Sequence, residues 1–309
     1  MSYEGKMLLD FGMPSRKEVE DVLLRSLFNH NGVIKEFGAN EEIVEEIAND
    51  FELNERQRNA FLETIYRKEN RIKKSFLWHR LLFRAADSLA NEKLISRPTQ
   101  TVHLTNKREW MLTEEGYNKV LKMMGIPRTQ KEILPVKSIE VQKIVNKIYS
   151  QKRPENYTPF EKNKKIIKVT LETKLRTRGF RQAIIEAYEF KCALCGLKIH
   201  SPSKSQWEVE AAHIVPHCFS GKDDLWNGLA LCHLHHWALD VGWFAVDDNY
   251  KVIASEKIRD VSTEYGKMGE YNFIGELLND NLIISFPKDK NNIPHQSAIR
   301  WHRENIFHK

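Results

Sequence analysis

Two neighbouring stretches decide the fold of the C-terminal half: Glu210-Ala-Ala-His213-Ile-Val-Pro216 and Asn227-Gly228-Leu-Ala-Leu-Cys232-His-Leu-His235-His236-Trp-Ala-Leu-Asp240. On a helix, His236 and Asp240 project to the same side, because four residues separate them, and together they can hold one divalent ion. Adjacent His235 and His236 point about 100° apart, because a helix has ~3.6 residues per turn. These two imidazoles can therefore serve two different metal ions.

A zinc-binding pattern surrounds this region. Cys192-Ala-Leu-Cys195 precedes it, and Cys232-His-Leu-His235 lies within it. Thiolate and imidazole ligands suit tetrahedral zinc, so the pattern predicts a closed structural Zn²⁺ site made by Cys192, Cys195, Cys232 and His235. The alternative is a set of ordinary buried or free thiols. Cys218 lies outside both pairs, and we expect it to be a free thiol.

The order and spacing of these motifs resemble the HNH (ββα-metal) nucleases, in the branch with the pattern AAHI-x-P, NGL-x-LC and HH-x-A-x-D. The resemblance covers about residues 175–255, and residues 299–307 look like the closing segment of that branch. It implies a two-stranded hairpin and a helix around a metal ion. His213 would end the first strand, Asn227 would lie in the connecting loop, and His236 would lie on the helix.

The same resemblance implies a catalytic role for each of these residues. His213 would be the general base, since a neutral imidazole accepts a proton well near physiological pH. His236 and Asp240 would hold Mg²⁺ or Mn²⁺, which polarises the scissile phosphate, and Asn227 would hold the loop in register. Many family members have an acidic metal ligand directly before the general base, where this chain has Ala212. Glu210, three residues upstream, is less convincingly placed.

The first 125 residues predict a mainly helical domain. Ser15-Arg-Lys-Glu18 is a capping-box pattern, Asn40 and Asn54 are candidate N-caps, and residues 75–91 place Trp78, Leu82, Ala85, Ala86 and Leu89 on one helix face. Residues 101–105 and 110–113 predict a β-hairpin whose tip is Asn106-Lys107-Arg108. Helices followed by a basic hairpin suggest a winged helix, and residues 15–125 resemble the N-terminal domain of Mrr-type restriction enzymes.

This second resemblance implies a DNA-recognition domain. Arg80 and Arg84 on the helix, with Lys107 and Arg108 at the hairpin tip, would contact bases or phosphates. The alternative for both helix arginines is an ordinary solvated position.

Length and composition set the wider organisation. A chain of 309 residues with 41% hydrophobic residues can bury two cores, so we expect an α+β protein with a winged-helix domain (1–125), a basic linker with a helix near 136–150 (126–174) and a zinc-stabilised HNH domain (175–309). Without a signal peptide or a membrane-length apolar run, we expect a cytoplasmic protein that does not contact membranes.

Positive charge gathers between the two predicted domains. Residues 128–181 contain fifteen Lys or Arg against five Glu, including the run Lys162-Asn-Lys164-Lys165 and the residues Arg176, Arg178 and Arg181. The run is either a solvated linker or a surface that contacts phosphates, and its place between two DNA-binding units favours the second interpretation.

Three functions remain compatible with these features. The favoured one is a sequence-specific, metal-dependent endonuclease that restricts foreign double-stranded DNA as a homodimer, leaves 5′-phosphate and 3′-hydroxyl ends, and can depend on modified cytosine. The second is a homing or nicking endonuclease. The third is a DNA-binding regulator whose zinc fold is purely structural, although a regulator has no need of the His213, Asn227 and His236 set.

Overall fold

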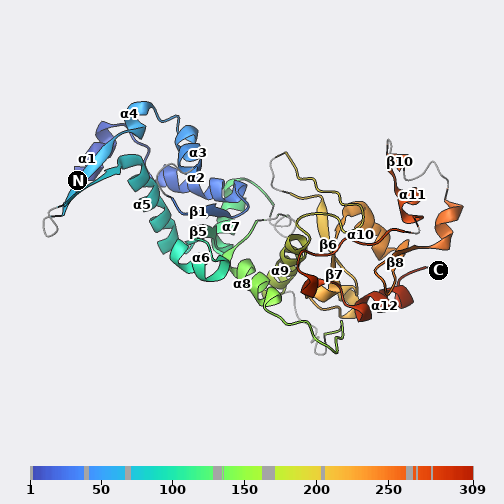
Figure 1. Cartoon of the computed structure of the whole chain (residues 1–309). Coiled ribbons are helices and arrows are strands. Elements are labelled where there is room, and N and C mark those ends of the chain that lie inside the picture. The colour runs from blue at the N-terminus through green and yellow to red at the C-terminus, as the bar shows by residue number, and fades with distance from the viewer. Residues whose placement is uncertain are drawn as a thin grey trace. The chain divides into compact units, whose positions relative to one another are not determined.

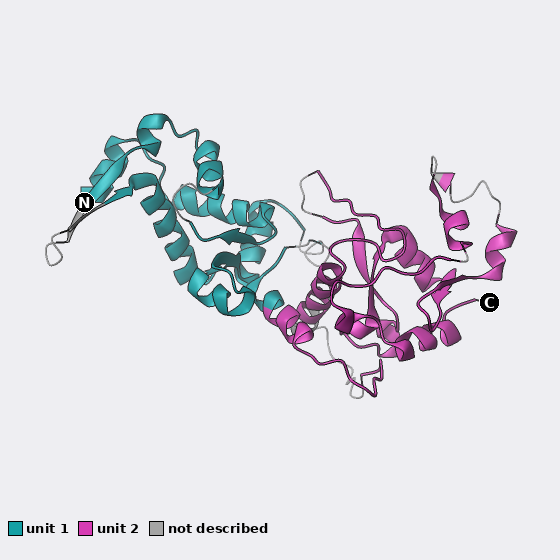
Figure 2. Ribbon diagram, viewed as in Figure 1, with its two compact units in different colours: residues 1–142 teal, residues 143–309 magenta. Residues whose placement is uncertain are grey.

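The computed structural model describes residues 3–37, 42–66, 71–127, 134, 136–161, 171–202, 206–261, 267–268, 271–279 and 281–308. The chain divides into two units, Met1–Gln142 and Lys143–Lys309, which Figure 2 colours separately. Asn40, Pro135 and the basic run 162–165 lie outside the described residues. Among the described residues, no helix is both long and apolar enough to cross a membrane.

Helices build most of the first unit. Its elements are α1 (Tyr3–Asp10), α2 (Arg16–Asn29), β1 (Val33–Lys35), α3 (Glu42–Asp50), α4 (Glu55–Arg58), β2 (Phe61–Tyr66), β3 (Arg71–Phe76), α5 (Leu77–Asn91), β4 (Ile95–Ser96), α6 (Pro98–Thr105), β5 (Glu109–Leu112) and α7 (Glu114–Met123). The capping box at Ser15 is confirmed, and Asn54 caps α4. On α5, the five predicted core residues are all buried.

The predicted hairpin at residues 101–113 is wrong. Pro98 occupies the start of a helix, where its missing N–H costs nothing, so residues 98–105 form α6 instead of a strand. The helix ends at Asn106, which adopts a left-handed conformation. Strand β5 then pairs with β1 on one side and β4 on the other, in the antiparallel order β1-β5-β4.

A hairpin that the sequence did not reveal lies earlier in the chain. Strands β2 and β3 pair from Phe61↔Phe76 to Tyr66↔Arg71, and β3 runs directly into α5. The segment Phe61-Leu-Glu-Thr-Ile-Tyr66 has strand-forming residues. Charged residues around it obscure the alternation of apolar and polar residues that would predict a strand.

A hairpin followed by a helix forms the centre of the second unit. Its elements are α8 (Ile139–Tyr149), which begins in the first unit, α9 (Leu171–Ala187), β6 (Val209–His213), β7 (Gly228–Cys232), α10 (His233–Asp240), β8 (Phe244–Val246), β9 (Val252–Ala254), β10 (Lys267–Met268), β11 (Tyr271–Asn272), α11 (Phe273–Leu277) and α12 (Gln296–Asn305). Strands β6 and β7 are antiparallel, and α10 follows β7 directly.

Helix α9 packs on both strands of this hairpin (Figure 1). The close approach depends on Gly228, which lies opposite His213 in the strand register. A Cβ at Gly228 would lie 2.2 Å from Ile184 Cδ1 and 3.1 Å from Phe180 Cζ. The absence of a side chain at Gly228 therefore lets α9 bring Phe180 close to the end of β6.

Candidate active site and zinc centre

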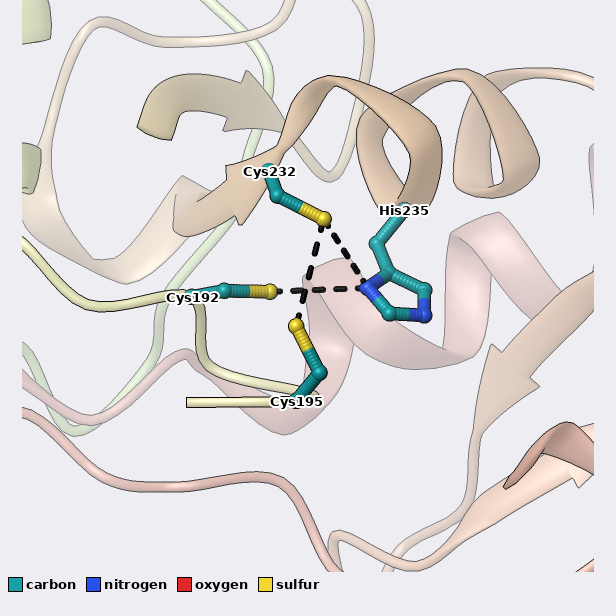
Figure 3. A group of neighbouring side chains, drawn as sticks. All are labelled: Cys192, Cys195, Cys232 and His235. Atoms are coloured by element: carbon teal, nitrogen blue, oxygen red, sulfur yellow. Dashed lines mark hydrogen bonds between the residues drawn. The ribbon is translucent and has the colours of Figure 1, made fainter. Parts of the chain in front are cut away.

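Three thiols and one imidazole converge at the junction of β7 and α10. The ligand atoms of Cys192, Cys195, Cys232 and His235 all lie within 4.8 Å of one another (Figure 3). Cys232 Sγ lies 3.1 Å from His235 Nδ1, and Cys195 Sγ lies 4.0 Å from Cys232 Sγ. A tetrahedral zinc with bonds of about 2.0–2.3 Å separates its ligands by roughly 3.6–3.8 Å, so these spacings suit zinc. The structure therefore brings together the predicted ligand set.

The electrostatics of the cluster also suit a metal. Hydrogen bonds from the thiols of Cys195 and Cys232 hold the pKa of the Cys192 thiol below its usual range, which favours the thiolate that zinc binds. Both Cys192 and His235 are fully buried. Burial closes the site to solvent, as in structural zinc centres.

Two further residues contact the outer nitrogen of His235. Nε2 lies 3.3 Å from the Tyr271 hydroxyl and 3.5 Å from Glu276 Oε2, and the Tyr271 hydroxyl donates to the same carboxylate at 2.5 Å. Such contacts orient a metal-binding imidazole with Nδ1 toward the metal. Sequence analysis assigns no chemistry to residues 271–276, because nothing in this segment links it to a motif about forty residues upstream.

His213 lies at the end of β6 and is held on two sides. Its Nε2 is 3.0 Å from Asp223 Oδ1, and its ring stacks on Phe180 with centroids 3.9 Å apart and an interplanar angle of 15°. Burial alone would raise the pKa of Asp223, but the hydrogen bond from His213 and the charge of Arg176 hold it below its usual value. An ionised Asp223 can only accept, so His213 donates from Nε2 and its Nδ1 carries the lone pair.

Asn227 fixes the loop that joins β6 to β7. The side chain is fully buried, accepts from the backbone N–H of Val215 at 2.8 Å, and donates to the carbonyls of Val215 at 3.1 Å and Lys222 at 3.0 Å. Its own carbonyl accepts from the N–H of Ile214. These bonds connect Asn227 to the two residues that follow His213, and thereby hold the end of β6.

The second imidazole of α10 lies between two carboxylates. His236 Nδ1 is 3.1 Å from Glu210 Oε2, and Nε2 is 3.5 Å from Asp240 Oδ2. Burial would lower the pKa of His236, but Glu210 and Asp240 raise it, and the hydrogen bond from His236 lowers the pKa of Glu210. Burial raises the pKa of Asp240 despite nearby His236 and His213. The ionised Glu210 therefore accepts from Nδ1–H, which leaves Nε2 facing Asp240.

Sequence analysis thus gave too little weight to Glu210. It lies three residues before His213, and strand alternation places it on the face of Ala212. It contacts different imidazoles through its two oxygens, since Oε1 lies 3.3 Å from His233 Nε2. Spacing along one strand could not show that Glu210 reaches across to α10.

The arginines predicted to contact DNA in the first unit have protein partners. Arg80 and Arg84 both bind the carboxylate of Glu4, at 2.7 and 2.6 Å, and the Glu4 side chain is 7% exposed. Arg108 pairs with Glu36 through both its Nε and its Nη2. Lys107 lies in the turn after α6. These positions remain predictions as DNA contacts, but three of the four side chains are already engaged.

Two of the three predicted arginines of α9, Arg176 and Arg181, interact with residues of the candidate site. Arg176 reaches Glu161 at 3.0 Å and Asp223 at 3.4 Å. Arg178 is 5% exposed, so it does not lie on a phosphate-facing surface. The charge of Arg181 affects the pKa values of both Glu210 and His236. Helix α9 thus adds Arg176 near the His213–Asp223 pair and Arg181 near the His236–Glu210 pair.

Comparison with known proteins supports the nuclease resemblance. Residues 192–247 match the HNH_2 family, described as HNH endonuclease. A solved structure titled "Modification dependent TagI restriction endonuclease" aligns at 21% identity over 41% of this chain and 37% of its own length, with a TM-score of 0.30. The chain therefore spans less than half of that protein. No curated protein matches.

The family match covers β6, β7 and α10 together with three zinc-pattern cysteines and both adjacent histidines. The match indicates a nuclease, which is a hydrolase, at this hairpin and helix. Residues 192–247 therefore form an HNH endonuclease domain.

Proposed function

We propose that this protein is a sequence-specific endonuclease that cuts double-stranded DNA and restricts foreign DNA. One observation carries the proposal. The hairpin and helix matched to the nuclease family present His213, whose Nδ1 has no hydrogen-bond partner among the described residues, and the histidine–carboxylate pair His236 and Asp240 on an adjoining element. A non-catalytic regulator would gain nothing from a carboxylate-oriented base.

His213 is the proposed general base. Its Nδ1 lone pair takes the proton from the attacking water, while Nε2–H stays bonded to Asp223. Phe180 supports the ring face and keeps Nδ1 aimed in one direction. Asn227 holds the backbone after His213, so its role is to position the base and not to touch the substrate.

His236 and Asp240 are the proposed ligands of Mg²⁺ or Mn²⁺. An imidazole nitrogen and a carboxylate oxygen suit Mn²⁺, and Mg²⁺ tolerates the set with water and phosphate oxygens completing its shell. Their atoms are 3.5 Å apart, near the separation of two neighbouring ligands on one ion. The bound ion would polarise the scissile phosphate and stabilise the departing 3′ oxygen, giving 5′-phosphate and 3′-hydroxyl ends.

The first unit is the proposed DNA-recognition domain. Its amphipathic helix α5 and its small antiparallel sheet β1-β5-β4 support the winged-helix interpretation, although α6 replaces the predicted wing. The unpredicted hairpin β2–β3 carries Lys74, which is exposed, pairs with Glu63 at 3.1 Å and lies over the Phe61 ring. We include this hairpin among the DNA-contacting elements.

The proposed number of protein copies on DNA depends on the number of active sites in each chain. The described part of each chain holds one His213–His236 centre, so a single copy would nick one strand at a time. Double-strand cleavage at a symmetric site suggests two copies related by a two-fold axis, and we propose a homodimer on DNA. A monomeric nickase would instead support the homing or nicking alternative.

The experiment is digestion of unmodified and cytosine-methylated plasmids with Mg²⁺ or Mn²⁺, with His213→Ala as the control. Discrete fragments from the wild type alone would support a sequence-specific endonuclease. The plasmid that is cut would show whether modified cytosine triggers or blocks cleavage. Binding without cleavage under every metal would refute the catalytic proposal and favour a regulator.

A further inference from the structure

We propose that Asp223 is a positioning residue that sets the tautomer of His213, and that Arg176 fixes the orientation of Asp223. The inference rests on the proposed function, because it concerns the nitrogen through which His213 acts. Neither residue was singled out for this role by the sequence, and Arg176 lies outside the segment matched to the nuclease family.

The geometry links three side chains from three parts of the second unit. Asp223, in the loop before β7, accepts from His213 Nε2 at 3.0 Å through Oδ1. Its other oxygen, Oδ2, lies 3.4 Å from Arg176 Nη2 on α9. The Asp223 side chain is 9% exposed and that of His213 is 18% exposed, so solvent competes little for these bonds.

The arrangement has a chemical consequence for the base. A carboxylate that accepts Nε2–H holds the single N–H proton of the neutral ring on Nε2, which leaves the lone pair on Nδ1. It also stabilises the imidazolium that forms when Nδ1 takes a proton from water. The proton moves from the water oxygen to Nδ1, and Nε2–H stays in place. Other titratable groups also lie near this set. Asp240 on α10 interacts electrostatically with His213, and His217 after β6 does so with Asp223. The same Nη2 of Arg176 also contacts Glu161 at 3.0 Å.

Arg176 gives the proposal a distinctive test. A guanidinium only donates, so in Asp223→Asn it would bind the oxygen of the introduced amide and turn the amide NH₂ toward His213. An NH₂ group cannot accept from Nε2–H. The ring proton would therefore move to Nδ1, and Nδ1 would no longer have the lone pair that accepts the proton from water. When Asp223→Asn is combined with Arg176→Met, the introduced amide would be free to turn its oxygen toward Nε2.

We therefore expect Asp223→Asn to lower the single-turnover cleavage rate by roughly 10²- to 10⁴-fold, the range for the loss of the orienting carboxylate in a histidine-based site. In the Arg176→Met background, the same substitution should cost at least about tenfold less. Asp223→Glu, which keeps the carboxylate, should recover part of the rate. Equal costs in both backgrounds would overturn the role of Arg176.

Two further measurements separate positioning from simple stability. The apparent pKa of the base in the pH–rate profile should be lower in the double variant Asp223→Asn with Arg176→Met than in Arg176→Met alone. An amide stabilises the imidazolium less than a carboxylate does. Nitrogen-15 NMR of the wild type, with zinc bound but without Mg²⁺ or Mn²⁺, should show His213 with its proton on Nε2. A proton on Nδ1 would overturn the proposal even if no cleavage were detected, whereas absent cleavage with the expected tautomer would refute only the proposed function.

Discussion

Glu210 Oε2 accepts a hydrogen bond from His236 Nδ1 at 3.1 Å, and this bond aims the opposite nitrogen of the ring at Asp240. The neighbouring His235 has the reverse arrangement, with Nδ1 toward the thiols and Nε2 toward Tyr271 and a glutamate. Each of the adjacent imidazoles thus has one nitrogen toward a proposed metal ligand and one toward a carboxylate that orients the ring. Such outer contacts fix the tautomer and orientation of metal-binding histidines.

Glu210→Gln should weaken binding of the catalytic ion. The amide holds His236 less firmly and carries no charge, so the Mg²⁺ or Mn²⁺ concentration for half-maximal cleavage should rise by about 10- to 100-fold. Zinc content should not change. The matched control is Glu208→Gln, because Glu208 contacts His233 but not His236. Equal metal dependence in both variants would contradict the role of Glu210.

Cys192→Ser should remove zinc and unfold much of the second unit. Structural zinc contributes about 10–16 kcal/mol of apparent binding free energy in small zinc domains, so its loss should lower the unfolding temperature sharply. Cys218→Ser is the control, because Cys218 is exposed and lies outside the cluster. Metal analysis should find one zinc per chain in wild type and Cys218→Ser. Full zinc content in Cys192→Ser would refute the assignment.

Asn227→Asp should destabilise the second unit although it preserves shape. The new carboxylate would face the carbonyls of Val215 and Lys222, which the amide now satisfies. Loss of two buried donors should lower the free energy of unfolding by about 2–5 kcal/mol, measured by urea denaturation at neutral pH. Asn305→Asp, at an exposed position on α12, should change it by less than about 0.5 kcal/mol. Similar effects at both positions would contradict the proposed role of the buried amide.

His302 should make stability fall in mild acid. Burial lowers its pKa to about 4, although its Nε2 donates to the Leu239 carbonyl at 3.1 Å. The unfolded chain protonates this histidine near pH ~6.5, whereas the folded chain does so only near pH 4, so the unfolded state binds more protons in between. The contribution of His302 to the free energy of unfolding is therefore complete above pH ~6.5. It declines by up to about 3 kcal/mol as the pH falls from there to about 4.

His302→Gln provides the comparison for this effect. Urea denaturation at pH ~7 and ~4 should show a smaller acid-induced loss in His302→Gln than in wild type, by up to about 3 kcal/mol. Carboxylates titrate in both proteins, so their effect cancels when the acid-induced losses of the two proteins are subtracted. An identical loss in both would show that His302 is not buried in its neutral form.

Motif spacing was enough to predict the cluster of three cysteines and one histidine. The two cysteine pairs predict their own convergence because ligand type and order are local properties, and the same holds for the separate directions of His235 and His236 on α10. The capping box at Ser15 was equally local. Each of these features depends on residues close together in sequence.

The features missed by sequence analysis depend on distant pairing. Glu276 reaches His235 from another helix, and Asp223 reaches Arg176 from a loop. No periodic pattern in the sequence predicts contacts between residues so far apart. In the first unit, the strand-like Thr101–Thr105 segment became part of α6 because Pro98 starts a helix and β5 finds its partners in β1 and β4. Tertiary pairing overrode local preference there.

The most direct test of the central claim is the cleavage of an end-labelled duplex by wild type and His213→Ala under single-turnover conditions with saturating Mn²⁺. The account predicts cleavage by wild type, a loss of about 10²- to 10⁴-fold in His213→Ala, and equal DNA affinity for both proteins. Cleavage by His213→Ala at the wild-type rate would contradict it, because the proton of the attacking water would then leave through another group.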